Sequence, residues 1–584
     1  MSTSSDPRRE LIALFDEMGS ILELLGANGF KVNASRKVAR VLEDMTGDIT
    51  RFRDDAKGLQ AIDGIGKSSA EKICTYLQTG SMPDFEKLLA QVPEGLLAVL
   101  EIPGLGPKTV RAMWEHAGVE SVADLEKAIA DDGLGDVPRM GPKTIANIAD
   151  SIEFLKKAGD RTPLGTAWPL AEKIVDHLGS RPGVSRIAFA GSLRRGRDTI
   201  GDIDILACCE DAPSLIEHFQ STKGVEKVLL AGDTKCSIRL ERGIQVDLRV
   251  VAESAFGAAL MYFTGSKEHN VRLRERAIKA GMRLNEYGLF TDDGEDEPPQ
   301  NRGIEPIASE TEESIYAALG LPMHPPELRE DRDDLESVPE LVTIEDIKAE
   351  LHAHTTASDG HLSLEELVAA AKARGFHTLA VTDHSRSSVQ ANGLDEKRLL
   401  AHIDAIRQVN EDTEGITVLA GSEVDILSDG RLDYDDELLA RLDLVVASPH
   451  VALTQDPKKA TARLLAAIRH PLVHIIGHPT GRIINRRPGL SPDMDTLIEA
   501  AVECDTALEI NANPQRLDLR DVHVRAAVDA GCRISIDTDA HAESHFDFLR
   551  YGVITARRGR CTPADCVNCM PAADLHAWLK SKRP

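Results

Sequence analysis

The sequence lacks any apolar run long enough to cross a membrane. No stretch of the 584 residues approaches the roughly 20 apolar residues of a membrane helix. Residues 1–15 carry charges and no long apolar core, so we expect no secretory signal peptide. Nor is there a disulfide framework, because the nine cysteines are odd in number and irregularly spaced. We therefore expect a cytoplasmic protein with free thiols and no membrane partner.

The sequence also lacks an excess of positive charge. Its formal net charge of −27 at pH 7 argues, taken alone, against a nucleic-acid partner. Much of the acid falls in two stretches, 292–297 and 327–340, which resemble loops or linkers. Local clusters of basic residues must therefore carry any DNA binding. The length is sufficient for several domains with sizeable cores.

The stretch 191–206, GSLRRGRDTIGDIDIL, places a basic glycine loop directly before two carboxylates on one expected strand. Asp202 and Asp204 are two residues apart, so on a strand they point to the same face. A second alternating segment, 244–250, offers Asp247 if the two strands are neighbours. Adjacent carboxylates repel, and three hard oxygen ligands favour Mg²⁺ or Mn²⁺. The residues that suit a triphosphate beside such ions are Gly191, Ser192, Arg194, Arg195 and Arg197.

These residues resemble the nucleotidyltransferase signature of the family X DNA polymerases. The resemblance extends to the Tyr-Phe-Thr-Gly-Ser sequence at 262–266 and reaches back to Arg161. It implies that Ser192 and two arginines hold the triphosphate, that two aromatic side chains select the sugar, and that Asn270 lies against the base. The nucleotide-binding residues that it implies are Arg161, Gly191, Ser192, Arg195, Gly201, Tyr262, Phe263, Gly265, Asn270 and Arg274.

Two similar glycine turns lie nearer the N-terminus, at 62–73 and 102–111. Each precedes an expected helix, whose first backbone N–H groups would face a phosphate. They resemble helix-hairpin-helix motifs, which implies binding to the DNA backbone without reading of bases. An ordinary tight turn explains any single copy, but two copies followed by lysine favour binding; a third, at 140–147, carries Arg139 in place of the first glycine and is expected to be structural. The expected DNA-binding residues are Gly64, Gly66, Lys67, Gly104, Gly106 and Lys108.

Lys72 follows the first glycine turn, where the family resemblance implies the Schiff-base lysine of a deoxyribose-phosphate lyase. The matching segment 31–37 carries Ser35 where DNA polymerase beta has tyrosine. A solvated helix lysine accounts for Lys72 equally well, so both interpretations stay open.

Beyond residue 345, short apolar runs end repeatedly in residue types that bind metals, and each is followed by a helical pattern. The runs are 349–354, 378–384, 418–423, 444–450, 473–478 and 534–541. Strands with functional residues at their C-terminal ends are typical of an α/β barrel. Mixed nitrogen and oxygen donors in this number predict a cluster of more than one ion, of Mn²⁺, Zn²⁺ or Fe²⁺. The proposed ligands are His352, His354, Asp359, His384, Glu423, His450, His478, Asp539 and His541.

In order, these segments resemble the motifs of the PHP (polymerase and histidinol phosphatase) domain. Together with the polymerase motifs, they identify the chain as a bacterial or archaeal-type family X polymerase with a fused PHP domain. The resemblance implies gap-filling DNA synthesis in repair and a Mn²⁺-dependent 3′–5′ exonuclease, with 3′-phosphatase or abasic-site endonuclease activity as further options. Three late cysteines at 561, 566 and 569 have no clear fourth ligand and are expected to be free thiols rather than a zinc site.

The expected architecture is multidomain: an all-α helix-hairpin-helix region, an α+β palm with a thumb, and a distorted α/β barrel. The expected boundaries are 1–85 and 86–157 for the helical domains, 158–260 for the palm, 261–320 for the thumb, 321–345 for a linker and 346–584 for the PHP domain. Expected partners are gapped or nicked duplex DNA and deoxynucleoside triphosphates, bound by a monomer near the nucleoid. Two alternatives stay open: nucleotide transfer to a non-DNA acceptor by a chain whose PHP domain is a metabolic phosphatase, and a DNA-end scaffold with inactive sites.

Overall fold

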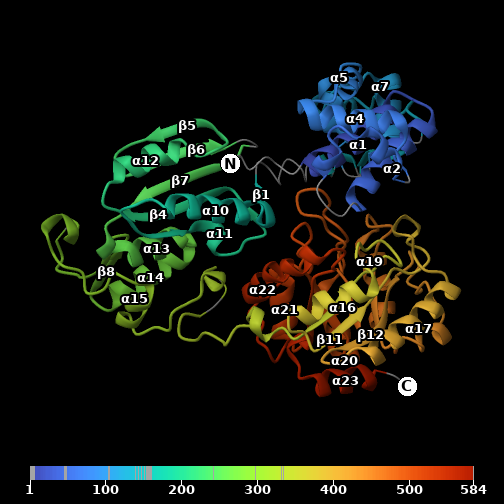
Figure 1. Ribbon diagram of the computed structural model, residues 1–584. Coiled ribbons are helices and arrows are strands. Elements are labelled where there is room, and N and C mark those ends of the chain that lie inside the picture. Colours follow the sequence, from blue (N-terminus) through green and yellow to red (C-terminus); the bar gives the residue numbers. More distant parts are fainter. Residues whose placement is uncertain are drawn as a thin grey trace. The chain divides into compact units, whose positions relative to one another are not determined.

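The structure is a computed structural model and forms two compact units, residues 1–158 and 159–584 (Figure 1). It describes residues 7–44, 49–62, 64–100, 102, 105–138, 140–142, 144–146, 148–149, 151–152, 161–240, 243–295, 297–330, 332 and 334–582. Among the described helices, none combines the length and the hydrophobicity that a membrane span needs.

The first unit is helical. Its elements are α1 (Pro7–Leu24), α2 (Gly29–Asp44), η1 (Ile49–Phe52), α3 (Ala56–Gln60), α4 (Lys67–Thr79), α5 (Pro83–Leu89), α6 (Glu94–Leu100), α7 (Pro107–Ala117) and α8 (Val122–Ala130). Leu11, Phe15 and Met18 of α1 are buried, as their three- and four-residue spacing predicts. One core is built mainly from the helices up to α5, and a second is built mainly from α6 to α8 with Leu24 of α1. The first hairpin packs mainly in the first core and the second hairpin mainly in the second.

The two hairpin turns join α3 to α4 and α6 to α7. Gly64 has a φ of +93°, a conformation that favours glycine. Gly66 and Gly106 are the N-caps of α4 and α7, and a Cβ at either would meet no atom within 4 Å. Gly104 and Arg139 lie outside the described residues, so the second hairpin is seen in part and the third only in fragments.

The palm is a five-stranded sheet covered by helices. Its elements are β1 (Thr162–Pro163), α10 (Leu164–Gly179), β2 (Val184–Phe189), α11 (Gly191–Arg194), β3 (Thr199–Ile200), β4 (Asp202–Cys209), α12 (Ala212–Gln220), β5 (Val225–Ala231), β6 (Lys235–Leu240) and β7 (Gln245–Val250). The strand order is β2-β4-β7-β6-β5, in which only the β4–β7 pair is parallel. The small β1–β3 ladder lies beside it.

The thumb follows the palm sheet directly. Its elements are η2 (Glu253–Ala255), α13 (Phe256–Thr264), α14 (Lys267–Lys279), β8 (Met282–Asn285), β9 (Gly288–Thr291), η3 (Pro299–Arg302) and α15 (Glu312–Ala318). Ser266 caps α14 by accepting a hydrogen bond from the His269 N–H. Residues 262–266, which carry part of the family resemblance, therefore form the end of α13 and the link to α14.

The segment 321–345, expected as a linker, packs against both neighbours. It contains η4 (Pro326–Leu328) and η5 (Ile344–Asp346). Arg329 is fully buried and forms an ion pair with Glu312 of the thumb, and Val342 is buried in the barrel core. We call this segment the connector. Its prolines and acids resemble those of a free linker, but several of its charges, among them Glu327, Arg329 and Glu330, form ion pairs within the fold.

The C-terminal part is a seven-stranded parallel sheet in chain order, nearly closed into a barrel. Its strands are β10 (Ala349–Ala353), β11 (Thr378–Val381), β12 (Thr417–Asp425), β13 (Leu444–Ser448), β14 (Ile475–Ile476), β15 (Ala507–Asn511) and β16 (Ile534–Asp537). A parallel bridge between Ala353 and Ala540 joins the first and last strands. The sequence pattern predicts six of these strands but not β15.

Helices cover the barrel, and several begin at the side-chain caps that the sequence provides. The helices are α16 (Leu364–Ala373), η6 (Val389–Ala391), α17 (Glu396–Asp412), α18 (Asp436–Leu439), α19 (Pro457–Ile468), α20 (Met494–Cys504), α21 (Asp521–Asp529), η7 (Glu543–Phe548), α22 (Leu549–Arg558), η8 (Val567–Cys569) and α23 (Ala572–Ser581). Ser363, Asp395, Asp456 and Asp493 each cap a helix. Trp578 of α23 joins the inner core at the strands' N-terminal ends, which leaves their C-terminal ends for the site.

Candidate active sites

Three carboxylates meet on the palm sheet. Asp204 on β4 lies directly opposite Asp247 on β7, and Asp202 points to the same face two residues earlier. Burial and then the charges of the other two raise the pKa of Asp204 to about 7; burial and Asp247 also raise the pKa of Asp202. Ser237 Oγ donates to Asp247 and fixes its orientation. Repelling oxygens held in place suit a small divalent cation, so the donor set fits Mg²⁺ or Mn²⁺.

Residues 191–197, which we call the nucleotide loop, lie against these carboxylates, and Gly191 allows this close approach. Its φ is +62°, and a Cβ there would stand 2.3 Å from Asp204 Oδ2. The Ala190 N–H donates to the Asp204 carbonyl over 2.8 Å, which ties the start of α11 to β4. Only glycine meets both conditions, so the sequence pattern has a steric cause.

A cavity of about 630 Å³ opens beside Asp202 and Asp204. All ten residues of the implied nucleotide-binding set line it: Arg161, Gly191, Ser192, Arg195, Gly201, Tyr262, Phe263, Gly265, Asn270 and Arg274. Arg197, Ser266 and Lys267 complete its wall. The structure thus gathers residues more than 100 positions apart in the sequence around one strongly polar space.

Several of these side chains are anchored from behind. Arg161 donates to the Thr199 carbonyl over 2.6 Å, on the β1–β3 ladder. Asn270 donates to the Tyr262 carbonyl over 2.7 Å, and Tyr262 meets Phe263 edge to face. These contacts fix the aromatic pair at the cavity wall before any ligand arrives.

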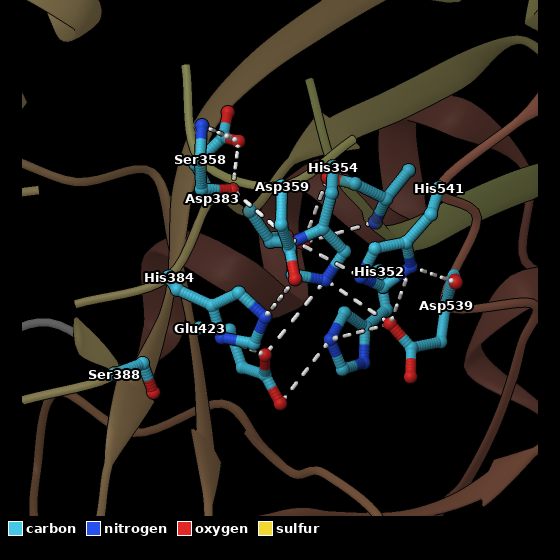
Figure 2. Close-up of polar contacts among 12 residues, drawn as sticks. His352, His354, Ser358, Asp359, Asp383, His384, Ser388, Glu423, Asp539 and His541 are labelled. Atoms are coloured by element: carbon cyan, nitrogen blue, oxygen red, sulfur yellow. Dashed lines mark hydrogen bonds and ion pairs between the residues drawn. The ribbon is translucent and has the colours of Figure 1, made fainter. Parts of the chain in front are cut away.

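The nine proposed barrel ligands lie close together at the C-terminal side of the strands, and Figure 2 shows seven of them: His352, His354, Asp359, His384, Glu423, Asp539 and His541. Their ligand atoms form three overlapping groups, each within 4.8 Å: His354, Asp359, His384 and His541; His352, His354 and Asp539; and His384, Glu423 and His450. His478 Nε2 lies 2.8 Å from Glu423 Oε1 and adds the ninth donor. Because His354 and His384 each belong to two groups, the arrangement fits more than one ion.

Buried atoms without hydrogen-bond partners support this fit. In the described part of the chain they include His352 Nε2, His354 Nδ1 and Nε2, His384 Nδ1, Glu423 Oε2 and Asp539 Oδ1. Leaving such atoms unsatisfied in a protein interior is costly, and native folds rarely do so. These six atoms belong to imidazoles and carboxylates, the donors that Mn²⁺, Zn²⁺ and Fe²⁺ accept.

The electrostatics of the cluster point the same way. Burial lowers the pKa of His352, but the charges of Glu509, Asp539 and Glu423 outweigh it and raise that pKa well above the usual value. Burial and then the neighbouring imidazoles lower the pKa of His354. Protons must therefore balance the cluster wherever cations do not, and metal binding would release them.

Three acidic residues that the sequence reading missed hold the ligands in place. Glu509, on the missed strand β15, lies 2.6 Å from His352 Nδ1. Asp425 lies 2.8 Å from His450 Nδ1. Asp383 accepts hydrogen bonds from both backbone and side chains of the loop that carries Asp359. Such partners fix the ring orientation of a histidine ligand. Asp383 could have been found from the sequence because it directly precedes the proposed ligand His384. Glu509 lies inside its strand, where no neighbouring ligand marks it.

A second cavity, of about 590 Å³, opens on this cluster. Besides the ligands, Arg487, Arg516, Val389 and Val451 are among the residues that line it. Ile483 and Arg487 belong to the loop 481–487, which also reaches the palm. Its Asn485 donates to the Arg161 carbonyl over 2.6 Å, and its Ile484 joins the palm core. One short loop therefore contributes to the barrel cavity and supports the β1 end of the palm.

Lys72 of α4 is engaged by polar neighbours. Its Nζ donates to Ser68 Oγ over 2.6 Å and forms an ion pair with Asp84 at 3.3 Å. Ser35 is buried and donates to the Phe15 carbonyl, so it joins α1 and α2 rather than lining a site. Lys67 and Lys108, at the starts of α4 and α7, are exposed. The lyase assignment stays a prediction.

The nine cysteines are all unpaired, and those at 561 and 566 are buried. Among the described residues, none of the groups suited to a metal contains a cysteine.

Comparisons with known proteins match separate parts of the chain. Family models match a helix-hairpin-helix domain at 6–82, a SAM-like helix-hairpin-helix tandem at 96–153, a DNA polymerase beta thumb at 259–330 and a PHP domain at 350–513. The chain is 37% identical over 579 residues to the DNA polymerase/3′-5′ exonuclease PolX of Bacillus subtilis (strain 168), which covers 98% of this chain and 99% of that protein. The chain belongs to the PolX family.

Other relatives match the PolX-family chain in part. DNA polymerase lambda of Rattus norvegicus is 27% identical over 290 residues, which is 46% of this chain and 48% of that protein. A probable phosphatase of Caldanaerobacter subterraneus is 29% identical over 202 residues, or 32% of this chain and 74% of that protein. The predicted family and fold class are confirmed. The full-length PolX match also disfavours the non-DNA transferase with a metabolic phosphatase.

Proposed function

We propose that the palm cavity adds deoxynucleotides to a DNA primer and that the barrel cluster removes them from a 3′ end. The observation that carries this proposal is that one chain, similar over nearly its whole length to a DNA polymerase/3′-5′ exonuclease, retains both donor sets intact. Asp202 and Asp204 line the palm cavity, with Asp247 opposite Asp204 on the neighbouring strand, and seven of the nine barrel donors line the barrel cavity, with His352 and His354 buried behind them.

In the palm, Asp202, Asp204 and Asp247 would hold Mg²⁺ or Mn²⁺. When bound, such ions neutralise the charge that builds on the transferred phosphate. Ser192, Arg195 and Arg161 hold the triphosphate. Tyr262 and Phe263 contact the sugar and Asn270 contacts the base, while Gly191 and Gly201 keep the loop close to the carboxylates. Held in this way, the nucleotide lies in line with a primer hydroxyl.

In the barrel, the nine donors would hold a cluster of Mn²⁺, Zn²⁺ or Fe²⁺. Such a cluster supplies a water of lowered pKa and a clamp for a phosphate oxygen. Glu509 and Asp425 keep the rings of His352 and His450 turned toward the cluster.

We further propose that the two helix-hairpin-helix motifs bind the DNA by its phosphate backbone. Gly66 and Lys67 of the first hairpin, and Gly106 and Lys108 of the second, would contact phosphates, with Gly64 and Gly104 shaping the turns. Gapped or nicked duplex is the proposed substrate, in short-gap repair by a cytoplasmic monomer near the nucleoid. The domain boundaries at 85, 157, 260, 320 and 345 belong to this proposal.

The test uses a primer-template with a one-nucleotide gap, incubated with and without nucleotides in Mg²⁺ and then in Mn²⁺. Asp247→Ala should abolish primer extension and leave primer shortening intact. His352→Ala with His354→Ala should do the reverse. Loss of a metal ligand should cost about 10³-fold in rate or more.

The control is a second, independent preparation of each variant, which exposes contaminating nucleases. If the histidine double variant shortens primers at the wild-type rate in Mn²⁺, the barrel is not the exonuclease. If the wild type extends a gapped tRNA-like acceptor better than gapped DNA, the proposed substrate is wrong.

A further inference from the structure

The barrel packs against the palm beside the nucleotide loop. Ile484, Leu517 and Tyr551 of the barrel are part of the palm's hydrophobic core. Arg482 of the barrel forms an ion pair with Asp198, which follows the nucleotide loop, at 2.9 Å. The seam between palm and barrel is therefore apolar at its centre and charged around it.

Glu330 of the connector is the centre of a partly buried ionic cluster at this seam. It accepts a hydrogen bond from Arg195 Nε over 3.2 Å and one from Arg558 Nη1 of the barrel over 3.2 Å. Arg197 lies 3.6 Å from its other oxygen. The side chain of Glu330 is 14% exposed and that of Arg558 is 4% exposed. Three guanidinium groups from two domains thus share one carboxylate.

Arg195 is anchored through its side chain and through its own carbonyl. Its Nε donates to Glu330, its Nη1 donates to the Thr264 carbonyl over 2.5 Å, and its own carbonyl accepts from Arg558 Nη1 over 2.6 Å. No described residue hydrogen-bonds to its Nη2. Arg195 also lines the palm cavity. The anchored guanidinium therefore keeps one edge free at the place where the triphosphate is proposed to bind.

The charges explain why an acid can stand so near a triphosphate site. A lone carboxylate there would repel the ligand. Glu330 is instead outnumbered by Arg195, Arg197 and Arg558, and these cations hold its pKa below the usual value against the effect of burial. Removing Glu330 takes the carboxylate partner from Arg195 and Arg197, while Arg558 keeps its ion pair with Asp521.

We propose that Glu330 and Arg558 are positioning residues for Arg195, so that the barrel completes the triphosphate site of the palm. This inference rests on the proposed function, because it needs Arg195 to bind the triphosphate. It makes the exonuclease domain a structural part of the polymerase even when no hydrolysis takes place.

The experiment measures kcat and KM for the incoming nucleotide on gapped DNA in Mg²⁺, with the full chain. Glu330→Gln and Arg558→Lys should each raise KM by about tenfold while kcat changes by less than about threefold. Neither residue lines the barrel cavity, so exonuclease rates in Mn²⁺ should stay at the wild-type level. In an Arg195→Ala background, Glu330→Gln should raise KM no further, because its effect passes through Arg195.

The matched control is Arg550→Ala. Arg550 lies on the same helix, α22, and pairs across the same seam with Glu172 at 3.3 Å, but it does not touch the nucleotide loop. Its KM should equal that of the wild type. Equal increases for Arg550→Ala and Glu330→Gln, or additive effects of Glu330→Gln and Arg195→Ala, would overturn the inference. A variant that loses exonuclease activity and thermal stability together is misfolded, and the milder of the two seam variants then decides. A wild type that adds no nucleotide refutes the proposed function instead.

Discussion

Gly191→Ala should silence synthesis through a single methyl group. The new Cβ would lie 2.3 Å from Asp204 Oδ2, about 1 Å closer than ordinary contact. Either the carboxylate or the nucleotide loop must move by that amount, and a misplacement of about 1 Å can cost about 10²-fold in rate. The positive φ of 62° adds about 1–2 kcal/mol of backbone strain.

Gly183→Ala separates the two effects. Gly183 is also in the palm and has a φ of +87°, but a Cβ there would meet its nearest atom, Cys209 Sγ, at 3.9 Å. Both variants should lose similar stability in thermal unfolding, and both should keep the exonuclease activity of the barrel. Only Gly191→Ala should lose primer extension, by about 10²-fold or more. Equal extension by the two variants would show that the close approach to Asp204 is not what the glycine provides.

Three further predictions concern other parts of the chain. Glu509→Gln should lower exonuclease activity and metal content about 10- to 100-fold without changing primer extension. The reason is that an amide lacks the negative charge that the Glu509 carboxylate places beside the His352 ring. Metal analysis of the purified variant checks this. Gly66→Val with Gly106→Val should weaken binding equally on DNA of unrelated sequences. Protein stability should stay unchanged, because a Cβ at either position would meet no other atom. Filter binding over a range of salt concentrations measures the affinity, and a strong sequence preference would contradict this prediction. If Lys72 is the lyase nucleophile, borohydride should trap an adduct with abasic DNA that Lys72→Ala abolishes, and an undiminished adduct assigns the reaction to another amine.

The barrel site was largely predictable because its ligands end the strands. An apolar run that finishes in His352 and His354, or in Asp539 and His541, shows both the strand and its functional end in a few residues. β15 breaks this pattern, since Glu509 lies within the strand and Asn511 ends it without an imidazole. Its role depends on a contact with His352, 157 positions away, and no local pattern encodes such a distance.

The connector shows the same limit for domain organisation. Prolines and acids at 321–345 resemble a solvated linker, and their composition is correctly read. What the sequence does not show is that Glu330 finds its cations at 195, 197 and 558, in two different domains. Charge pairs of this kind are set by tertiary packing, so composition alone misjudges how tightly the segment is held. Conversely, the shared face of Asp202 and Asp204 was predictable because it requires only alternation along β4, whereas the place of Asp247 also depended on the pairing of β4 with β7.

Surface loops usually tolerate insertion and deletion, and this freedom lets the members of a family diverge. The loop 481–487 has little of it, because Asn485 is tied to the palm while Arg487 forms part of the wall of the barrel cavity. A change of length that suits one neighbour displaces the other. Anyone who grafts a different barrel onto this palm, or trims the barrel away, must therefore transplant or replace this loop as well, and natural variation in its length should be found only together with changes on both sides.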